Sequence, residues 1–166
     1  MRQVVPRMDQ VQAGAWMALM TTAQLLPAAL DEQLTADAAL INFEYGILAA
    51  LNVAPDQTMR MGELAAAAHS PAPRLSKAVN RLEARGLVER VACAGDGRAI
   101  NVHLTREGRR TWLQATPPHI EFARDTILGS LTPDQLTALT ELLQPIISRL
   151  DPDACPSDHP PEQAGR

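Results

Sequence analysis

Apolar side chains recur at three- and four-residue spacing over two long stretches, residues 8–34 and 132–150. This spacing is typical of helices that bury one face, so we predict a long helix in each stretch. The second helix has a clear start, because residues 132–135 combine a threonine capping box with proline at the first helical position. Pro27 and Pro145 lack a backbone N–H, and we expect each to bend or divide its helix.

Shorter elements are predicted between these two helices. Asn42 is expected to cap a helix that ends before Pro55, residues 58–61 are expected to be extended, and residues 62–68 form a short helix.

A further helix, residues 72–85, follows after only a Ser-Pro turn. Pro71 or Pro73 lies in its first turn, where a missing N–H costs little, and Gly86 offers the left-handed exit that helices commonly use. Two helices joined by so short a turn predict a helix-turn-helix.

Two strands should come next, over residues 87–93 and 99–104, because apolar residues alternate in the second of them. Residues 94–97, with the sequence Ala-Gly-Asp-Gly, predict a tight turn between the strands. The resulting hairpin directly follows the helix-turn-helix, which is the position of a wing.

Thr105 is predicted to cap a long helix that runs toward Leu128, and the pair Pro117-Pro118 should interrupt or kink it. Residues 152–166 are rich in proline and polar side chains and have nothing to bury. We predict that this tail is disordered.

Charge is distributed unevenly along the chain. The net charge of −4 by itself disfavours binding to nucleic acid. Residues 69–110, however, hold nine basic and four acidic side chains, a balance of +5, which leaves −9 on the remainder. An acidic body with one basic segment is typical of a DNA-binding module on an acidic scaffold. The abundance of Ala and Leu, with only 3% aromatic residues, favours a mostly helical (α+β) fold.

The helix over residues 72–85 carries its apolar side chains on one face and polar ones on the other. Amide, hydroxyl and cationic groups on an exposed helix match the hydrogen-bonding edges and phosphates of a major groove. The outward side chains that we predict to contact DNA are Pro73, Ser76, Lys77 and Asn80, with Arg74, Arg81 and Arg85 beside them. A solvated amphipathic helix with ordinary arginines is the alternative.

The predicted hairpin turn carries a second candidate contact. Arg98 lies next to the glycines of the turn, where a guanidinium can enter a narrow minor groove. Asp96, two residues earlier, can hold that guanidinium in a fixed direction by a charge-assisted hydrogen bond. An exposed ion pair of little energetic consequence is the alternative.

The run from Asn80 to Arg90, Asn-Arg-Leu-Glu-Ala-Arg-Gly-Leu-Val-Glu-Arg, is followed by Asp96-Gly97-Arg98 and by Leu-Thr-Arg-Glu-Gly-Arg at residues 104–109. In order and spacing these motifs resemble the MarR family of winged helix-turn-helix transcription regulators, over about residues 16–150. The resemblance implies a homodimer with intertwined terminal helices, bound to a palindromic operator in double-stranded DNA. It also implies repression, relieved in many members by a small aromatic effector or an oxidant.

The resemblance divides the chain into three parts. Residues 8–34 and 106–150 are expected to form the helical dimerisation region, and residues 42–105 the winged helix-turn-helix. The wing has Asp-Gly-Arg where many members have Asp-Arg-Arg, which removes one cation. Pro73 and Arg74 are unusual at the start of the recognition helix, so the operator sequence does not carry over.

Effectors in this family commonly bind between the dimer helices and the DNA-binding domain. We expect Trp16 and His119 there, since a large ring can stack on an aromatic ligand and an imidazole can read its polar group. The alternative places Trp16 in the dimer core and His119 in solvent. Peroxide sensing is disfavoured because the first helix has no cysteine; Cys93 reads as a small apolar residue of a strand rather than a redox switch.

Other classes of protein find little support in the sequence. There is no Gly-rich phosphate loop, no Gly-x-Ser-x-Gly elbow and no histidine spacing suited to a metal, so we predict neither an enzyme nor a cofactor. No run of about 18 apolar residues or secretion signal is seen, and we predict a cytoplasmic protein without a membrane partner. A winged-helix dimer that has lost DNA binding remains the alternative function.

Overall fold

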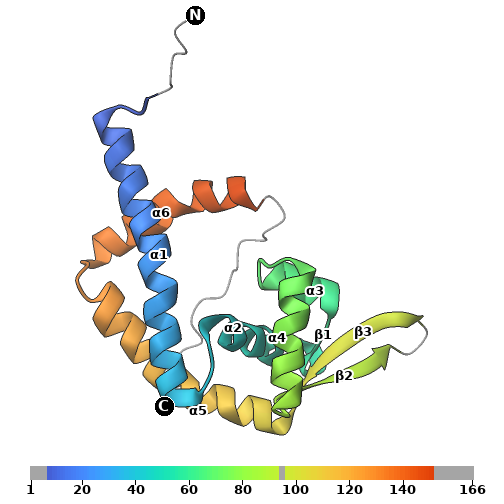
Figure 1. The fold of residues 1–166 in the computed structure, drawn as a ribbon. Helices are drawn as coiled ribbons and strands as arrows, with labels where there is room; N and C mark the ends of the chain where they lie inside the picture. The colour runs from blue at the N-terminus through green and yellow to red at the C-terminus, as the bar shows by residue number, and fades with distance from the viewer. Residues whose placement is uncertain (1–6, 94–95, 152–166) are drawn as a thin grey trace, which may run out of the picture.

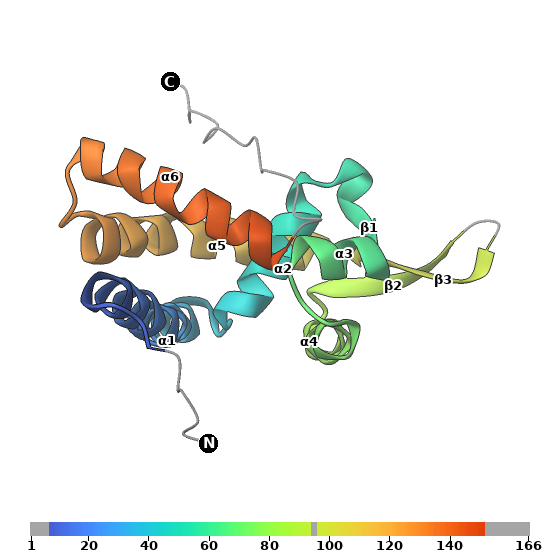
Figure 2. The same cartoon turned by 90° about the horizontal axis from the view of Figure 1, so that it is seen from above.

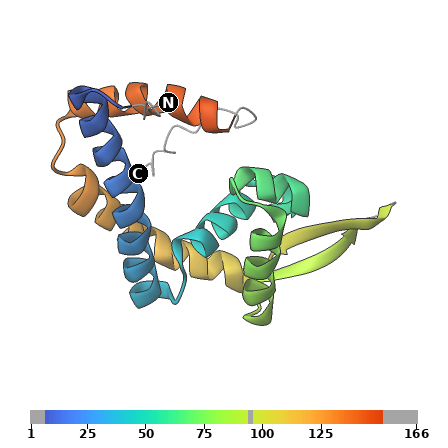
Figure 3. The same cartoon turned by 45° about the horizontal axis from the view of Figure 1, so that its top comes forward.

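The computed structural model describes residues 7–93 and 96–151, and the side chains of residues 93 and 96–99 lie outside this description. The described chain has two parts, which Figure 1 shows at opposite ends. We call residues 42–105 the head, and the helical residues 10–38 and 106–150 the arm. Figure 3 shows helix α5 (Arg106–Phe122), which starts beneath the head and runs into the arm.

The arm is built from three helices, α1 (Gln10–Ala38), α5 (Arg106–Phe122) and α6 (Pro133–Leu150). The predicted capping box at Thr132 and the predicted cap at Thr105 are both confirmed. No proline divides its helix, because α1, α5 and α6 each continue through their prolines, and the bends expected at these positions stay predictions. Each proline removes only one backbone hydrogen bond, and the bonds on either side maintain the helix. The irregularity comes later, as a π-helical segment η2 (Ala123–Leu128) that extends α5.

The head begins with α2 (Asn42–Val53), a short η1 (Pro55–Gln57) and strand β1 (Thr58–Arg60). The prediction that Asn42 caps α2 is wrong. The N-cap is Ile41, and the backbone N–H of Asn42 donates to the Asp31 carboxylate of α1 at 2.7 Å. A carboxylate from another helix therefore does what the asparagine side chain was expected to do.

The predicted helix-turn-helix is confirmed as α3 (Met61–Ala67) followed by α4 (Ala72–Ala84). Pro73 lies in the first turn of α4, as expected. Gly86 has φ +71°, the left-handed conformation that ends the helix and that glycine adopts without strain.

Three antiparallel strands complete the head in the order β1-β3-β2, with β2 at Val88–Cys93 and β3 at Asp96–Leu104. The third strand, β1, pairs with the inner end of β3. β3 starts earlier than predicted, so that Asp96 and Gly97 belong to the strand rather than to a turn. Figures 1 and 2 show the β2–β3 hairpin projecting from the head beyond α4. This arrangement is a winged helix-turn-helix.

The described core lies almost entirely in the head. Its fully buried side chains come mainly from α2, α3, α4 and the sheet, among them Ile47, Leu64, Val79 and Val102. The start of α5 closes this core at Gly108, where a Cβ atom would overlap the carbonyl oxygen of Leu87. Glycine is therefore required for α5 to approach β2 so closely.

The arm, in contrast, exposes large apolar side chains. Val11, Met17 and Leu25 of α1 are more than half exposed, and Leu142 of α6 is 70% exposed. By length and composition α1 is apolar enough to cross a membrane, with an 18-residue window of mean hydropathy 1.2 that is not buried in this chain. Helices that pack against other helices in soluble proteins meet the same criterion, so composition alone does not separate the two cases.

Candidate nucleic-acid interface

Helix α4 presents the two faces that the sequence predicts. Leu75, Ala78, Val79 and Leu82 are completely buried, which fixes the rotation of the helix on the head. This packing leaves the opposite face in solvent, next to the projecting hairpin (Figure 2). The predicted contact residues on that face are Pro73, Arg74, Lys77, Asn80 and Arg81, all exposed, and Ser76, which is half-buried.

On this face of α4, Lys77 and Arg74 form no ion pair with a carboxylate of the described chain. Lys77 makes no ion pair or side-chain hydrogen bond with any described residue. The Arg74 guanidinium lies over the ring of Phe43 in α2, 4.4 Å from the ring centroid. This cation–π contact leaves the edge of the guanidinium free to donate hydrogen bonds.

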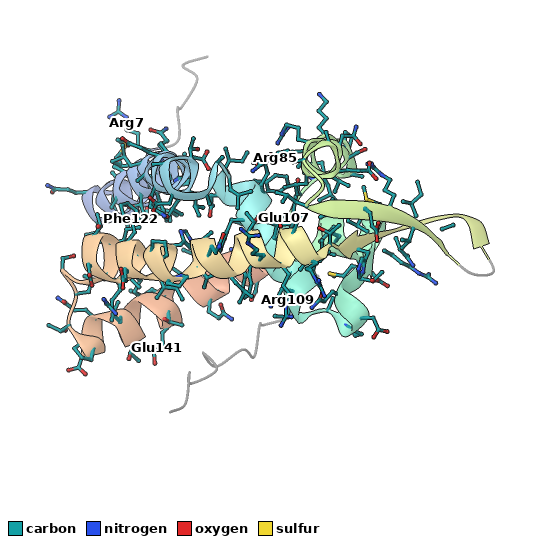
Figure 4. The ribbon with its side chains drawn as sticks, turned by 90° about the horizontal axis from the view of Figure 1, so that it is seen from below. Arg7, Arg85, Glu107, Arg109, Phe122 and Glu141 are labelled. Carbon is teal, nitrogen blue, oxygen red and sulfur yellow. The ribbon has the colours of Figure 1, made fainter. Side chains whose placement is uncertain are left out.

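Arg81 is not a free cation, although the sequence suggested one. Its Nε donates to Glu44 Oε1 at 2.8 Å, and Arg85 lies 3.5 Å from Glu44 Oε2. Glu44 comes from α2 and is only 5% exposed, so its carboxylate depends on these two arginines for compensation. Arg81 and Arg85 thus share the buried Glu44 carboxylate of α2. Figure 4 labels Arg85.

Glu44 was missed in the sequence, although its position carries a signal. It precedes the buried residues Ile47, Leu48 and Leu51 by three, four and seven positions. This spacing places the carboxylate on the buried face of α2. An acidic residue at such a position requires a partner, and the arginines of the next helices are the available ones.

A second network joins α4 to strand β2. The Glu83 carboxylate accepts hydrogen bonds from the backbone N–H of Arg90, at 3.0 Å, and from its guanidinium. The other terminal nitrogen of Arg90 donates to Asn80 Oδ1 at 2.6 Å. Arg90 therefore braces the exposed face of the recognition helix from the strand behind it.

The two wing residues singled out in the sequence lie at the start of β3. The backbone of Asp96 and Arg98 belongs to that strand, within the projecting hairpin. Their side chains are outside the description, so the predicted bond between them stays a prediction. The basic N-terminal part of α5 lies at the same end of the molecule, where Figure 4 labels Glu107 and Arg109. Glu107 forms an exposed pair with Arg110 at 3.7 Å.

His119 occupies the junction between arm and head. Its ring lies 4.5 Å from that of Tyr45 in α2, and its Nδ1 lies 2.8 Å from Gln33 Oε1 in α1. Because Gln33 Nε2 donates to Asp37, the oxygen of the amide faces His119 and Nδ1 carries the proton. Burial lowers the pKa of His119 below its ordinary value, so the imidazole is neutral near pH 7, with Nε2 as an acceptor.

Trp16 does not join His119 within one chain. It is about half exposed and precedes Gln33, the α1 partner of His119, by 17 residues, about 25 Å along a helix. The sequence missed Tyr45 and Trp112 instead. Trp112 lies on the same face of α5 as His119, and its buried Nε1 has no hydrogen-bond partner in the described chain.

The other described histidines, His69 and His103, lie in separate parts of the structure. His103 bonds to Thr58 across the β1–β3 pair, and His69 Nδ1 lies 2.6 Å from Asp151 at the end of α6. Among the described residues, no group of three His, Cys, Asp or Glu side chains could hold a metal ion. The His69–Asp151 pair is a further contact, between the head and the residue that follows α6.

Comparisons with known proteins agree with this architecture. A model of the MarR family matches residues 40–99. The chain is 34% identical to Sco3205, a MarR family transcriptional regulator from Streptomyces coelicolor solved in complex with DNA, covering 91% of this chain and 95% of that one with a TM-score of 0.85. It is 30% identical to AbsC, a MarR family transcriptional regulator from the same organism, covering 88% and 98% with a TM-score of 0.82.

Bordetella bronchiseptica BpsR shares the fold, at 22% identity and a TM-score of 0.70, covering 80% of this chain and 98% of that chain; its DNA binding is regulated by 6-hydroxynicotinic acid. The identities to the two Streptomyces regulators extend over the head and the arm together. The chain therefore belongs to the MarR family of transcriptional regulators.

Proposed function

We propose that this protein is a sequence-specific regulator that binds a palindromic operator in double-stranded DNA as a homodimer. The observation that carries the proposal is the exposed polar face of α4, with Lys77 unpaired among the described residues, beside a projecting hairpin. A major groove accepts one helix, and a hairpin beside it can reach the adjacent minor groove. We expect Pro73, Arg74, Ser76, Lys77, Asn80 and, from the wing, Asp96 and Arg98 to form this surface.

The arm supports the homodimer. The exposed apolar side chains of α1 and α6 need a cover, and a second copy of the same helices supplies one by two-fold symmetry. Two heads held at a fixed separation then match two half-sites one helical turn apart. We propose residues 8–34 and 106–150 as the dimerisation region and residues 42–105 as the DNA-binding domain, acting in the cytoplasm.

The proposal includes repression that a small aromatic effector relieves. The junction of arm and head is its proposed site, because Nε2 of His119 offers an acceptor beside the Tyr45 ring, and the buried Nε1 of Trp112, on the same face of α5, offers a donor. The regulation of BpsR by 6-hydroxynicotinic acid is consistent with an aromatic acid there. We propose that Trp16 contacts the effector at the site of the partner subunit and not at the site of its own chain.

The salt dependence of operator affinity tests DNA binding most directly. Each phosphate contact releases counterions, so log K should fall steeply with log salt concentration. We expect Lys77→Ala to reduce that slope by about one. Arg124→Ala removes a cation from η2, where Arg124 pairs with Asp125 at 2.7 Å, and should leave the slope unchanged. An affinity that does not change with salt would contradict the proposal.

Arg98→Ala distinguishes the regulator from a winged-helix interaction protein without DNA binding. A DNA reader should lose operator affinity because the wing loses its minor-groove cation. An absence of operator affinity in both proteins would favour the interaction protein, and an affinity that Arg98→Ala leaves unchanged would remove Arg98 from the proposed surface. The effector is tested separately by adding aromatic acids to the protein–operator complex. Release that His119→Ala abolishes, with operator affinity retained, supports the proposed effector site, and release unaltered by this change removes it.

A further inference from the structure

The bond between Arg90 and Asn80 bears on how the recognition helix reads sequence. Arg90 is fixed from behind, because Glu83 accepts both its backbone N–H and one of its guanidinium nitrogens. The second terminal nitrogen is thereby aimed at α4, where it donates to Asn80 Oδ1 at 2.6 Å. The guanidinium is half-buried against the helix, whereas Asn80 remains exposed.

This contact settles the orientation of the Asn80 amide. A guanidinium has only donors, so the atom of Asn80 that faces Arg90 must be the oxygen. The amide nitrogen then points away from Arg90 with two hydrogens to donate. Lys77, one turn earlier on the same exposed face, has only donors as well.

We infer that Asn80 reads DNA through the donors of its amide group and that Arg90 is the positioning residue that imposes this. The inference rests on the proposed function and specifies the base class that this position recognises. An asparagine with both groups free pairs with adenine, donating to N7 and accepting from N6. The bond to Arg90 takes one of the two lone pairs of Oδ1 and turns the oxygen toward Arg90, which disfavours the paired contact with N7 and N6 of adenine. Asn80 favours edges that offer only acceptors, N7 and O6 of guanine or O4 of thymine.

A purely structural role for the same network is the competing explanation. In that case Arg90 would only hold β2 against α4, and Asn80 would be a hydrated side chain. Changes at either residue would then alter the stability of the head without altering base preference. Base preference at a single operator position is therefore the measurement that separates the two explanations.

The experiment selects operators from a randomised DNA library with the full-length wild-type protein and with Asn80→Ala. We expect Asn80→Ala to lose preference at one base pair in each half-site. At that pair the wild type should favour guanine or thymine over adenine by roughly tenfold. A wild-type preference for adenine that disappears when its N6 amine is removed would overturn the inference.

Two further variants test the part played by Arg90. Arg90→Met frees the oxygen of Asn80, and the preference at this pair should move toward adenine. Arg124→Met makes the same change at a cation of η2 that does not contact Asn80, and should leave the preference as in the wild type. A preference that Arg90→Met does not alter, in protein that keeps its helical circular dichroism, would overturn the positioning role.

Asn80→Asp keeps the result decisive if Arg90→Met does not fold. The aspartate retains the acceptor for Arg90 and replaces the outward donors by an acceptor, so preference should move to cytosine, whose N4 amine donates. Selection that still favours guanine or thymine would contradict the inference. If the wild type selects no DNA at all, the proposed function fails. If it selects an operator on which Asn80→Ala has no effect, only this inference fails.

Discussion

The head and the arm of this molecule differ in how much of their apolar surface is buried within one chain. In the head, α2, α3, α4 and the sheet supply most of the fully buried side chains. In the arm, α1 buries only Leu34 and α6 buries no residue within the described chain. The head is therefore a domain with its own core, whereas the arm is complete only when another surface covers it.

The two parts meet through the edge of the core and through polar contacts, since Leu34 of α1 and Ala115 of α5 are buried in the same cluster as the head residues. Asp31 of α1 accepts the first amide of α2, His119 of α5 stacks on Tyr45, and His69 pairs with Asp151. The first and third of these contacts are hydrogen bonds, for which water can substitute, whereas the second is a contact between two rings.

The largest expected effect comes from placing a charge on the exposed apolar stripe of the arm. Ile147→Glu puts a carboxylate where a partner should cover a side chain that is 46% exposed here. The substitution is present in both subunits of a two-fold dimer, so its unfavourable free energy enters twice. The dimer dissociation constant should therefore rise by at least about 100-fold. Analytical ultracentrifugation over a range of concentrations measures it.

Ser148→Glu is the matched control, since it adds the same charge one position along α6, on the opposite side of the helix from the apolar stripe. It should leave the dissociation constant unchanged within about threefold. Equal effects of the two substitutions, or a monomeric wild type, would break the contrast between a self-sufficient head and an incomplete arm.

A smaller effect is expected in the head, at Glu44, whose buried carboxylate pairs with Arg81 and Arg85. Glu44→Gln removes the charge that Arg81 and Arg85 share, and should lower the free energy of unfolding by about 1–2 kcal/mol, because both arginines stay partly hydrated. Urea denaturation measures this value. Glu107→Gln breaks an exposed pair and should change the value by less than about 0.5 kcal/mol. A larger effect at Glu107 would contradict this account of the head.

The smallest effect concerns the junction and depends on pH. Burial lowers the pKa of His119, so the unfolded chain binds more protons than the folded one between the folded pKa and about 6.5. Stability should therefore fall as pH falls through this window. His119→Gln removes the group, and the difference in urea midpoint between pH 7.5 and 5.5 should be smaller than in the wild type. A larger difference in urea midpoint in His119→Gln than in the wild type would show that protonation of His119 stabilises the junction.

Local sequence determined the elements of this protein well. The period of Leu75, Val79 and Leu82 fixed the buried face of α4, and Gly86 and Thr132 marked where helices end and begin. Each of these features depends on residues within one or two turns, so the pattern contains the whole of the physical cause. Proline was weighted too strongly, since single lost hydrogen bonds did not end α1, α5 or α6.

Only the tertiary structure decided which polar groups are free to act. Glu44 neutralises Arg81 from 37 residues away, and His119 meets Gln33 across 86 positions, far from Trp16. The charge count of residues 69–110 therefore overstates the cations available to phosphates. Periodicity reports which side of an element faces inward, whereas the pairing of charges depends on how separate elements pack. Neighbours that are distant in sequence set the hydration and the partner of each polar side chain.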